Sequence, residues 1–396
     1  MKKYLERCFA ALLLLGLLAV PAAVWKYTRW ETSAYYENRS LAEFPALTWE
    51  SLWDGSFGAE LESWYSDHAP GRTTLLMADT QAQMELLKRP NVNGVVVNGD
   101  GVLLPFYDYP AHPKDFEAGA EKMTARFSKL HRHIEANGGV FLFAGIPEQG
   151  VYFDDRYPED LYDRSEEMER ADTTFFRHLE EKGVPYLDLG KTFEALGDPP
   201  ELYSRVDHHY TFYGAWTAYH AILDRLNGEG LSLPVLTEED VSFRTLPNPY
   251  IGSRNRKLYN LWEGAEQPVI PDPKAPVPYE RFDNGAPSET PLYITYEDPN
   301  QPTTYNLYMG GDFGETILKT NRPELPDALI FGDSFTNAME PLLYTAFDET
   351  RTLDLRHYDE KTLKDYITDY QPDVVLCILN DTFFYTPTGN GAVWED

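Results

Sequence analysis

Five short strand-like stretches, most of them apolar and separated by helical patterns, most constrain what this chain can fold into. They occupy residues 140–144, 184–189, 328–331, 352–356 and 373–379, and most of their side chains are branched or aromatic. Strands buried on both faces of a parallel sheet carry such runs, and the helices between them form the outer layers. We therefore predict an α/β fold with three layers and a mostly parallel sheet.

The helical patterns and the turn residues predict how the chain is divided. Helices are predicted at 56–68, 71–89, 115–136, 165–182, 211–227, 335–346 and 360–369, with a hairpin turn at 99–101. From 229 to 325 proline and glycine become dense and helical periodicity stops, which indicates a loop-rich or β-rich insertion. We expect a cytoplasmic tip and signal-anchor helix (1–30), a linker with a helical and hairpin lead-in (31–110), an α/β domain in two parts (111–228 and 326–396), and the insertion (229–325).

The N-terminus predicts export from the cytoplasm. Basic residues precede an uncharged apolar run at 9–25. With a rise of ~1.5 Å per residue this run spans ~26 Å, slightly less than a ~30 Å hydrocarbon core. Small residues at 20–22 suit signal peptidase, whereas the aromatic residues at 25–30 resemble an interfacial belt. We expect an uncleaved signal-anchor in a bacterial cell membrane, with the rest extracytoplasmic; the alternative is secretion after cleavage.

The charge balance excludes some ligands. The chain has 34 Lys and Arg against 64 Asp and Glu, which gives a formal charge of −30. Nucleic-acid binding needs clustered cations, so that class is excluded, and anionic polymers are disfavoured. A neutral or cationic glycan is a better ligand, and the 27 tyrosines suit a carbohydrate-facing surface. One of the two cysteines lies in the N-terminal segment, so the exported part has no internal disulfide.

A polar tripeptide, Gly332-Asp333-Ser334, lies where an apolar strand meets a helix. Functional groups of open α/β sheets lie at the carboxyl ends of strands, and a helix N-terminus offers N–H groups and a positive dipole end. Ser334 is therefore a candidate nucleophile beside donors that can hold an oxyanion. The alternative is that Asp333 or Ser334 only caps the helix.

A second polar segment, Asp207-His208-His209-Tyr210, precedes another predicted helix. Residues two apart in an extended segment project to the same side, so Asp207 can orient His209 as a general base while His208 points elsewhere. The alternatives are a helix cap at Asp207 or Thr211, two histidines that only satisfy structural hydrogen bonds, and a metal site. We predict no metal, because adjacent histidines diverge and no third ligand recurs at helical spacing.

Two further side chains follow predicted strands at the same edge. Asn380 follows the strand at 373–379 and is a candidate oxyanion donor; alternatively it only ends the strand in a turn. Arg356 ends the strand at 352–356 and is a candidate for binding substrate, although it can equally pair with an acidic side chain. His208 and Tyr210, which flank His209, are also substrate-binding candidates.

These motifs resemble a known family. Gly332-Asp333-Ser334 is similar to the nucleophile block of SGNH (GDSL-type) hydrolases, and 372–381 is similar to their Asn-bearing block. Asp207 and His209 precede the serine, a permuted order that resembles DHHW family proteins and the SGNH-like alginate O-acetylation proteins. Segments 37–45, 67–72 and 250–253 add to the similarity. Tyr210 replaces the tryptophan of the family name, and Ile378 replaces the glycine of the usual Asn block.

The resemblance implies a function and a set of roles. Ser334 is then the nucleophile, His209 the base and Asp207 the residue that orients it, without a cofactor. We expect a membrane-anchored O-acetyltransferase or acetylesterase acting on a cell-envelope polysaccharide, with acetyl groups delivered by a membrane-bound O-acyltransferase. One alternative is a non-catalytic glycan-binding or assembly protein that keeps the SGNH frame. A lipid esterase is another.

Overall fold

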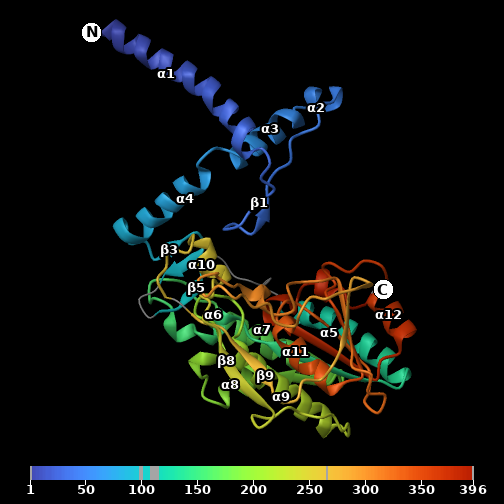
Figure 1. Ribbon diagram of the computed structural model, residues 1–396. Helices are drawn as coiled ribbons and strands as arrows, with labels where there is room; N and C mark the ends of the chain where they lie inside the picture. The colour runs from blue at the N-terminus through green and yellow to red at the C-terminus, as the bar shows by residue number, and fades with distance from the viewer. Residues whose placement is uncertain (1, 98–100, 108–115, 265, 395–396) are drawn as a thin grey trace. The chain divides into compact units, whose positions relative to one another are not determined.

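The computed structural model describes residues 2–97, 101–107, 116–264 and 266–394 (Figure 1). The chain forms two compact units: unit 1 comprises Met1–Val97 and Asn255–Glu263, and unit 2 comprises Asn98–Arg254 and Gly264–Asp396. The hairpin turn predicted at 99–101 falls mainly outside the described residues. All candidate site residues lie in unit 2.

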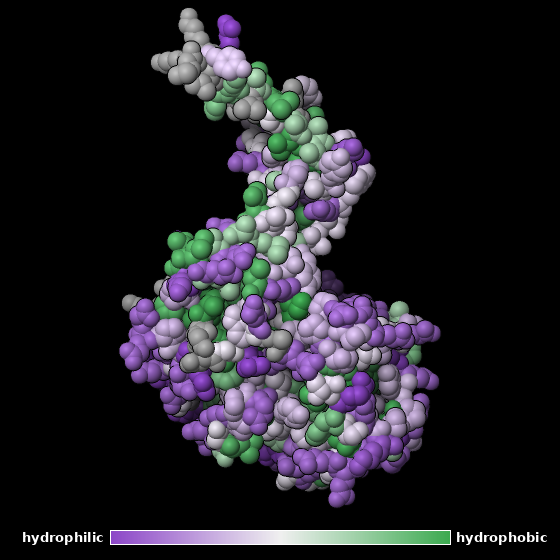
Figure 2. Space-filling model, turned by 60° about the vertical axis from the view of Figure 1, so that its left-hand side comes forward, coloured by the Kyte–Doolittle hydropathy of each residue, from purple (hydrophilic) through white to green (hydrophobic). Residues whose placement is uncertain are grey.

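Unit 1 begins with the apolar helix α1 (Lys2–Ala23), which continues as a π-helical turn, Val24–Thr28. The stretch Glu6–Thr28 is long and apolar enough to cross a membrane. At ~1.5 Å per residue it reaches ~35 Å, more than the predicted run at 9–25, because the helical stretch extends three residues further at each end. Figure 2 shows hydrophobic residues along this helix, whereas hydrophilic residues cover most of the visible face of unit 2. Helices of this kind serve as signal-anchors and as signal peptides.

Ion pairs join separate segments in the rest of unit 1. Arg39 donates to Asp67 at 2.8 and 2.5 Å, and Glu37 accepts from both Arg39 and Arg72. Two segments that the sequence singled out, 37–45 and 67–72, therefore meet in one network. The other elements of the unit are α2 (Trp49–Trp53), α3 (Ser56–Asp67), α4 (Arg72–Gln81), β1 (Ser33–Ala34), β2 (Arg39–Ser40), β3 (Asn91–Val92) and β4 (Val95–Val97).

Unit 2 contains a mixed sheet of eight strands in the order β11-β10-β12-β14-β13-β15-β6-β7. Its strands are β6 (Val140–Ile146), β7 (Tyr186–Asp188), β10 (Glu280–Asp283), β11 (Ala286–Pro287), β12 (Glu315–Lys319), β13 (Ala328–Gly332), β14 (Glu349–Leu353) and β15 (Val374–Asn380). Strands β14, β13, β15, β6 and β7 run parallel. Strands β12, β10 and β11 extend the sheet in antiparallel fashion.

Two helical layers enclose this sheet. On one face α5 (Phe116–Ala136), α7 (Ser165–Glu181) and α12 (Leu363–Tyr370) pack against the odd-numbered residues of β6, β13 and β15 in one hydrophobic core. Strand residues alternate between faces, so the even-numbered ones point to the layer that contains α9 (Phe212–Gly228) and α11 (Thr336–Leu343). Shorter elements of the unit are α6 (Gln149–Tyr152), α8 (Leu189–Glu194), β5 (Leu103–Pro105), β8 (Val241–Thr245) and β9 (Val269–Pro273), while α10 (Ser253–Lys257) lies where the chain leaves the unit.

The α/β fold is as predicted, but two details differ. The strand predicted at 352–356 is β14, which begins and ends three residues earlier. It ends there because the Asp354 carboxylate accepts a hydrogen bond from the backbone N–H of Arg356 at 3.0 Å and turns the chain. The stretch 229–325 also supplies three strands to the sheet, so the sheet is more mixed than a mostly parallel one.

Candidate active site

The candidate nucleophile lies in the turn between β13 and α11. Gly332 ends β13 so close to β15 that a Cβ on it would lie 1.8 Å from the carbonyl oxygen of Ile378. Asp333 is buried and accepts hydrogen bonds from the backbone N–H of Phe335 at 3.0 Å and of Asn380 at 2.7 Å. Asp333 thus ties the Ser334 turn to the end of β15, and burial raises its pKa to about 6. Ser334 itself is half-buried.

The base and its carboxylate lie on a tight loop that leads into α9. An antiparallel bridge between Tyr203 and Tyr210 closes the loop. Inside it, the Ser204 hydroxyl oxygen accepts a hydrogen bond from the Asp207 N–H at 3.0 Å. Thr211 caps α9 by accepting from the Tyr213 N–H at 3.1 Å. Of the two caps weighed from the sequence, the structure uses Thr211 and leaves Asp207 for the site.

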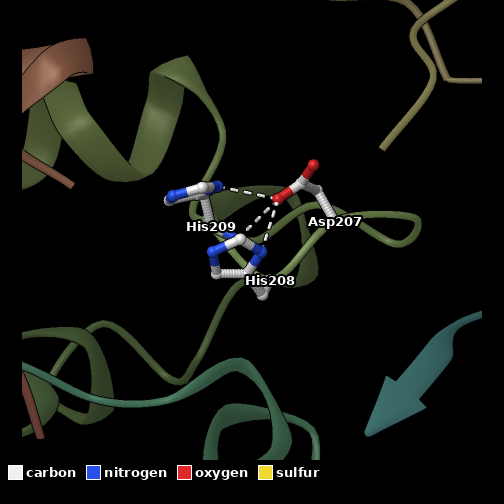
Figure 3. Close-up of side chains that lie close together, drawn as sticks. All are labelled: Asp207, His208 and His209. Atoms are coloured by element: carbon white, nitrogen blue, oxygen red, sulfur yellow. Dashed lines mark hydrogen bonds and ion pairs between the residues drawn. The ribbon is translucent and has the colours of Figure 1, made fainter. Parts of the chain in front are cut away.

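Asp207, His209 and Ser334 form a continuous hydrogen-bonded chain. His209 Nδ1 lies 2.7 Å from Asp207 Oδ1, a contact drawn as a dashed line in Figure 3, and His209 Nε2 lies 2.8 Å from Ser334 Oγ. The second oxygen of Asp207 accepts from the Ser253 N–H at 2.7 Å. A carboxylate only accepts, so Nδ1 of His209 carries the proton and Nε2 is free to accept from the serine hydroxyl. This is the arrangement that activates a serine nucleophile.

Burial and neighbouring side chains set the charge states of His209 and Asp207. Burial, with a smaller contribution from the neighbouring His208, lowers the pKa of His209 to about 4 against the opposing effect of Asp207. Burial opposes ionisation of Asp207, yet the imidazoles of His209 and His208 hold its pKa well below the usual range. At neutral pH the base is therefore an uncharged imidazole and its partner a carboxylate, as proton abstraction from Ser334 requires.

Tyr305, a residue that the sequence did not single out, covers the base. Its ring stacks on the His209 imidazole with centroids 3.5 Å apart and planes 4° from parallel. Tyr305 lies in a 3₁₀ turn, Tyr305–Leu307, within the Pro-rich stretch. Tyr305 belongs to no recognisable motif, and the sequence does not distinguish it from the other tyrosines of this stretch.

His208 and Tyr210 differ from their expected placement. The sequence predicted that His208 points elsewhere, but its ring lies beside that of His209, with centroids 3.7 Å apart. A peptide turn at this loop, rather than an extended strand, brings the two rings together. Tyr210 is only 1% exposed, and its hydroxyl donates to the carbonyl oxygen of Phe335. Tyr210 therefore braces the Ser334 turn, and it also lines a cavity of about 340 Å³ that is lined by none of Asp207, His209 and Ser334.

The side chains of Asn380 and Arg356 bind other residues of the protein. The Asn380 amide donates to the Ile146 carbonyl oxygen at 3.3 Å, and its side-chain oxygen accepts from the Thr382 hydroxyl at 2.6 Å. Arg356 forms ion pairs with Asp354 at 2.5 Å and Asp312 at 3.1 Å. Both side chains thus adopt the structural alternative weighed from the sequence. Among the described residues, the Ser334 backbone N–H has no hydrogen-bond partner, so it remains a donor for an oxyanion.

In the part of the chain that the structure describes, two clusters of side chains place potential metal-ligand atoms within 4.8 Å of one another. They are Asp207, His208 and His209, and Asp312, Asp354 and His357. In the first cluster Asp207 Oδ1 and His209 Nδ1 already bind each other, and in the second the carboxylates bind Arg356. A metal ion at either place would have to displace these partners, so the chemistry of the donors does not favour one.

Comparison with known proteins supports the predicted resemblance. Residues 104–277 match the family of the SGNH hydrolase-like domain of acetyltransferase AlgX. The structure of Bacillus cereus PatB1 is 23% identical over 73% of this chain and 96% of that one, with a TM-score of 0.63. PatB1 with a sulfonyl adduct is 22% identical over 73% and 95%, with a TM-score of 0.61. A DHHW family protein from Eubacterium siraeum is 18% identical over 75% and 96%, with a TM-score of 0.56.

These similarities confirm the resemblance to SGNH-like and DHHW proteins that the motifs predicted. At such identities the solved structures establish a shared fold. No curated protein matches the chain.

Proposed function

We propose that this chain is an extracytoplasmic, serine-dependent O-acetyltransferase that acts on a neutral or cationic polysaccharide of the cell envelope. The observation that carries the proposal is His209, which hydrogen-bonds Ser334 and Asp207 at the same time. The match of residues 104–277 to an acetyltransferase domain supports acetyl as the transferred group. Removal of acetyl groups by water uses the same residues, so acetylesterase activity belongs to the same proposal.

The geometry suggests a two-step reaction. Ser334 Oγ attacks the carbonyl carbon of the acetyl donor while His209 Nε2 accepts its proton, and the leaving group then takes that proton. The Ser334 N–H donates to the developing oxyanion, and Asp207 stabilises the imidazolium that forms for a moment. A hydroxyl of the acceptor then attacks the acetyl-serine by the reverse sequence of proton transfers.

The N-terminal helix supports a place at the membrane surface. In this proposal α1 anchors the protein in a bacterial cell membrane, and unit 2 faces the envelope. A membrane-bound O-acyltransferase then delivers the acetyl group across the bilayer. The net charge of −30 favours a neutral or cationic glycan as acceptor, because an anionic polymer would be repelled.

A sulfonyl fluoride probe tests the nucleophile directly. We expect phenylmethanesulfonyl fluoride to label the full-length chain in detergent on the peptide that contains Ser334, as read by mass spectrometry. Labelling and release of 4-nitrophenol from 4-nitrophenyl acetate should both disappear in Ser334→Ala. Turnover retained by Ser334→Ala would exclude this serine as the nucleophile. Thr336→Ala, two residues further along and buried in α11, is the matched control and should still be labelled.

The second candidate function is a glycan-binding or assembly protein without catalysis. Its support is the side chain of Asn380, which binds Ile146 and Thr382 instead of facing Ser334, so that one expected oxyanion donor is missing. Polysaccharide binding by a wild-type chain that is never labelled by the sulfonyl fluoride would favour it.

A further inference from the structure

Two imidazoles share one carboxylate in this site. His208 Nδ1 lies 3.2 Å from Asp207 Oδ1, the same oxygen that His209 Nδ1 contacts at 2.7 Å. His208 Nδ1 also lies 2.7 Å from the Ser253 hydroxyl oxygen. Figure 3 shows both rings extending from Asp207 toward the same side. The proposed triad uses only one of them.

The contacts of His208 Nδ1 indicate that the other ring nitrogen, Nε2, is a hydrogen-bond acceptor. A carboxylate oxygen only accepts, so the arrangement favours the proton on Nδ1, between Asp207 and Ser253. His208 Nε2 then carries a lone pair. The His208 side chain is 45% exposed, whereas that of His209 is 5% exposed. Among the described residues Nε2 has no hydrogen-bond partner, so a partly exposed side chain beside the base carries an unused acceptor.

We propose that His208 Nε2 accepts a hydrogen bond from a second hydroxyl of the acceptor, adjacent on the sugar ring to the hydroxyl that is acetylated. This inference rests on the proposed function and deepens it, because it names the acceptor as a saccharide with a free vicinal diol. His208 is then a substrate-positioning residue for the second half-reaction.

In that half-reaction His209 Nε2 transfers a proton, and His208 Nε2 only accepts a hydrogen bond. The reacting hydroxyl gives its proton to His209 Nε2 as its oxygen bonds to the carbonyl carbon of acetyl-Ser334. The bond between that carbon and Ser334 Oγ then breaks, and His209 returns the proton to Oγ. The neighbouring hydroxyl keeps its proton throughout and only donates a hydrogen bond to His208 Nε2.

The same arrangement disfavours hydrolysis. A single water molecule can approach one nitrogen, but a vicinal diol binds both and is held in the orientation for attack. Fixing the attacking group in this way lowers the entropy cost of the transfer step. His208 therefore selects a sugar over water without taking part in the proton transfer itself.

A competition between two small acceptors tests this proposal. The full-length chain in detergent is supplied with 4-nitrophenyl acetate and either cyclohexane-1,2-diol or cyclohexanol, and the acetylated alcohol is measured by mass spectrometry. Released 4-nitrophenol reports acylation of the enzyme. We expect wild type to acetylate the diol about tenfold more than cyclohexanol, the effect of one additional hydrogen bond.

Two variants isolate the role of Nε2. His208→Asn keeps a polar atom near the Nδ1 position but has none near Nε2, so we expect the preference to fall to about the twofold statistical value for two hydroxyls. His208→Gln carries an amide further out and should retain part of the preference. The KM for the diol should rise in His208→Asn more than kcat falls. His133→Asn, at a histidine on α5 that hydrogen-bonds Thr368, is the matched control and should keep the wild-type preference.

Different results would contradict the role of His208 and the proposed acetyltransferase function. Normal labelling of Ser334 and 4-nitrophenol release, together with equal acetylation of both alcohols or of neither, would overturn the role of His208 alone. An unchanged preference in His208→Asn would also overturn it. Absence of labelling and release in wild type would overturn both proposals.

Discussion

The ring of Tyr305 lies flat on the imidazole of His209, with 3.5 Å between the ring centroids and 4° between the planes. The Tyr305 hydroxyl is buried and has no hydrogen-bond partner among the described residues. A turn within the Pro-rich stretch thus closes one face of the base. Since burial is the main reason for the low pKa of His209, Tyr305 contributes to the charge state of the site.

Two substitutions of Tyr305 distinguish the effect of its ring from the effect of its hydroxyl. Tyr305→Leu removes the stacked ring and admits water, so we expect the pKa of His209 to rise toward its usual value of about 6.5. The acid limb of the pH–rate profile should shift upward with it. Tyr305→Phe keeps the ring and removes an unpaired buried hydroxyl, so its profile should match wild type. Identical profiles for all three proteins would show that the ring does not control the base.

The pH dependence of the wild-type reaction follows from the same pKa. His209 must be neutral to accept the Ser334 proton, and its pKa is about 4. We therefore expect kcat/KM for 4-nitrophenyl acetate to rise with pH through about 4 and to reach a plateau above about pH 5.5. The measurement needs circular dichroism at each pH to confirm that the protein remains folded. A limb centred between pH 6 and 7 would contradict the buried environment of the base.

Asp207→Asn tests the orientation of the imidazole. The amide cannot hold His209 in the same protonation form, because it lacks the charge and offers a donor where an acceptor is needed. We expect kcat to fall by roughly 10³- to 10⁴-fold with little loss of folded protein. Asp312→Asn removes a carboxylate that acts on His209 through charge alone, and its effect should stay below about tenfold. Equal losses in the two variants would assign Asp207 a purely electrostatic effect.

Gly252 supports the triad through its backbone. A Cβ at this position would lie 2.2 Å from the carbonyl oxygen of Val206 and 2.7 Å from the N–H nitrogen of Asp207. Gly252→Ala must therefore displace the loop or the adjacent Ser253 N–H, which donates to Asp207. We expect at least a roughly 100-fold loss of kcat, as for other displacements of about 1 Å near a reacting group. Gly228→Ala, where a Cβ meets open space at the end of α9, is the control.

Glu340 makes stability depend on pH. This buried residue of α11 accepts a hydrogen bond from Thr336 at 3.1 Å, and burial raises its pKa to about 7. The folded state thus binds a proton more tightly than the unfolded chain does. The associated stability is complete below pH 4.5 and is lost as pH rises through about 7.

We accordingly expect Glu340→Gln, which stays neutral, to increase the free energy of unfolding at pH 8 by about 1–3 kcal/mol and to have little effect at pH 5. Urea titrations at the two pH values provide the measurement. Glu289→Gln, at an exposed acid, should change stability equally little at both. A destabilisation by Glu340→Gln that is the same at pH 5 and pH 8 would contradict the assigned ionisation.

The sequence predicted the parts of this protein that depend on local order. Apolar runs and helical periodicity predicted the strands of the parallel region and the long helices, with β14 displaced by three residues. The resemblance of the motifs to SGNH-like proteins is confirmed, and the spacing of Asp207 and His209 suggested the pair that meets in the structure. The contribution of 229–325 to the sheet was not foreseen, because antiparallel pairing with β14 depends on partners far away in sequence.

The sequence by itself determined which chemical groups are present and in what order: a serine after a buried strand, an Asp-x-His segment before a helix, and an apolar N-terminal helix. The tertiary structure alone decided which groups meet. It brought Ser334 within 2.8 Å of His209 across 125 residues, covered the base with Tyr305, turned His208 toward the same side, and directed Asn380 to Ile146. Side-chain identity is local, whereas orientation follows from the hydrogen bonds and packing that remote segments supply, so only the folded chain could settle these relationships.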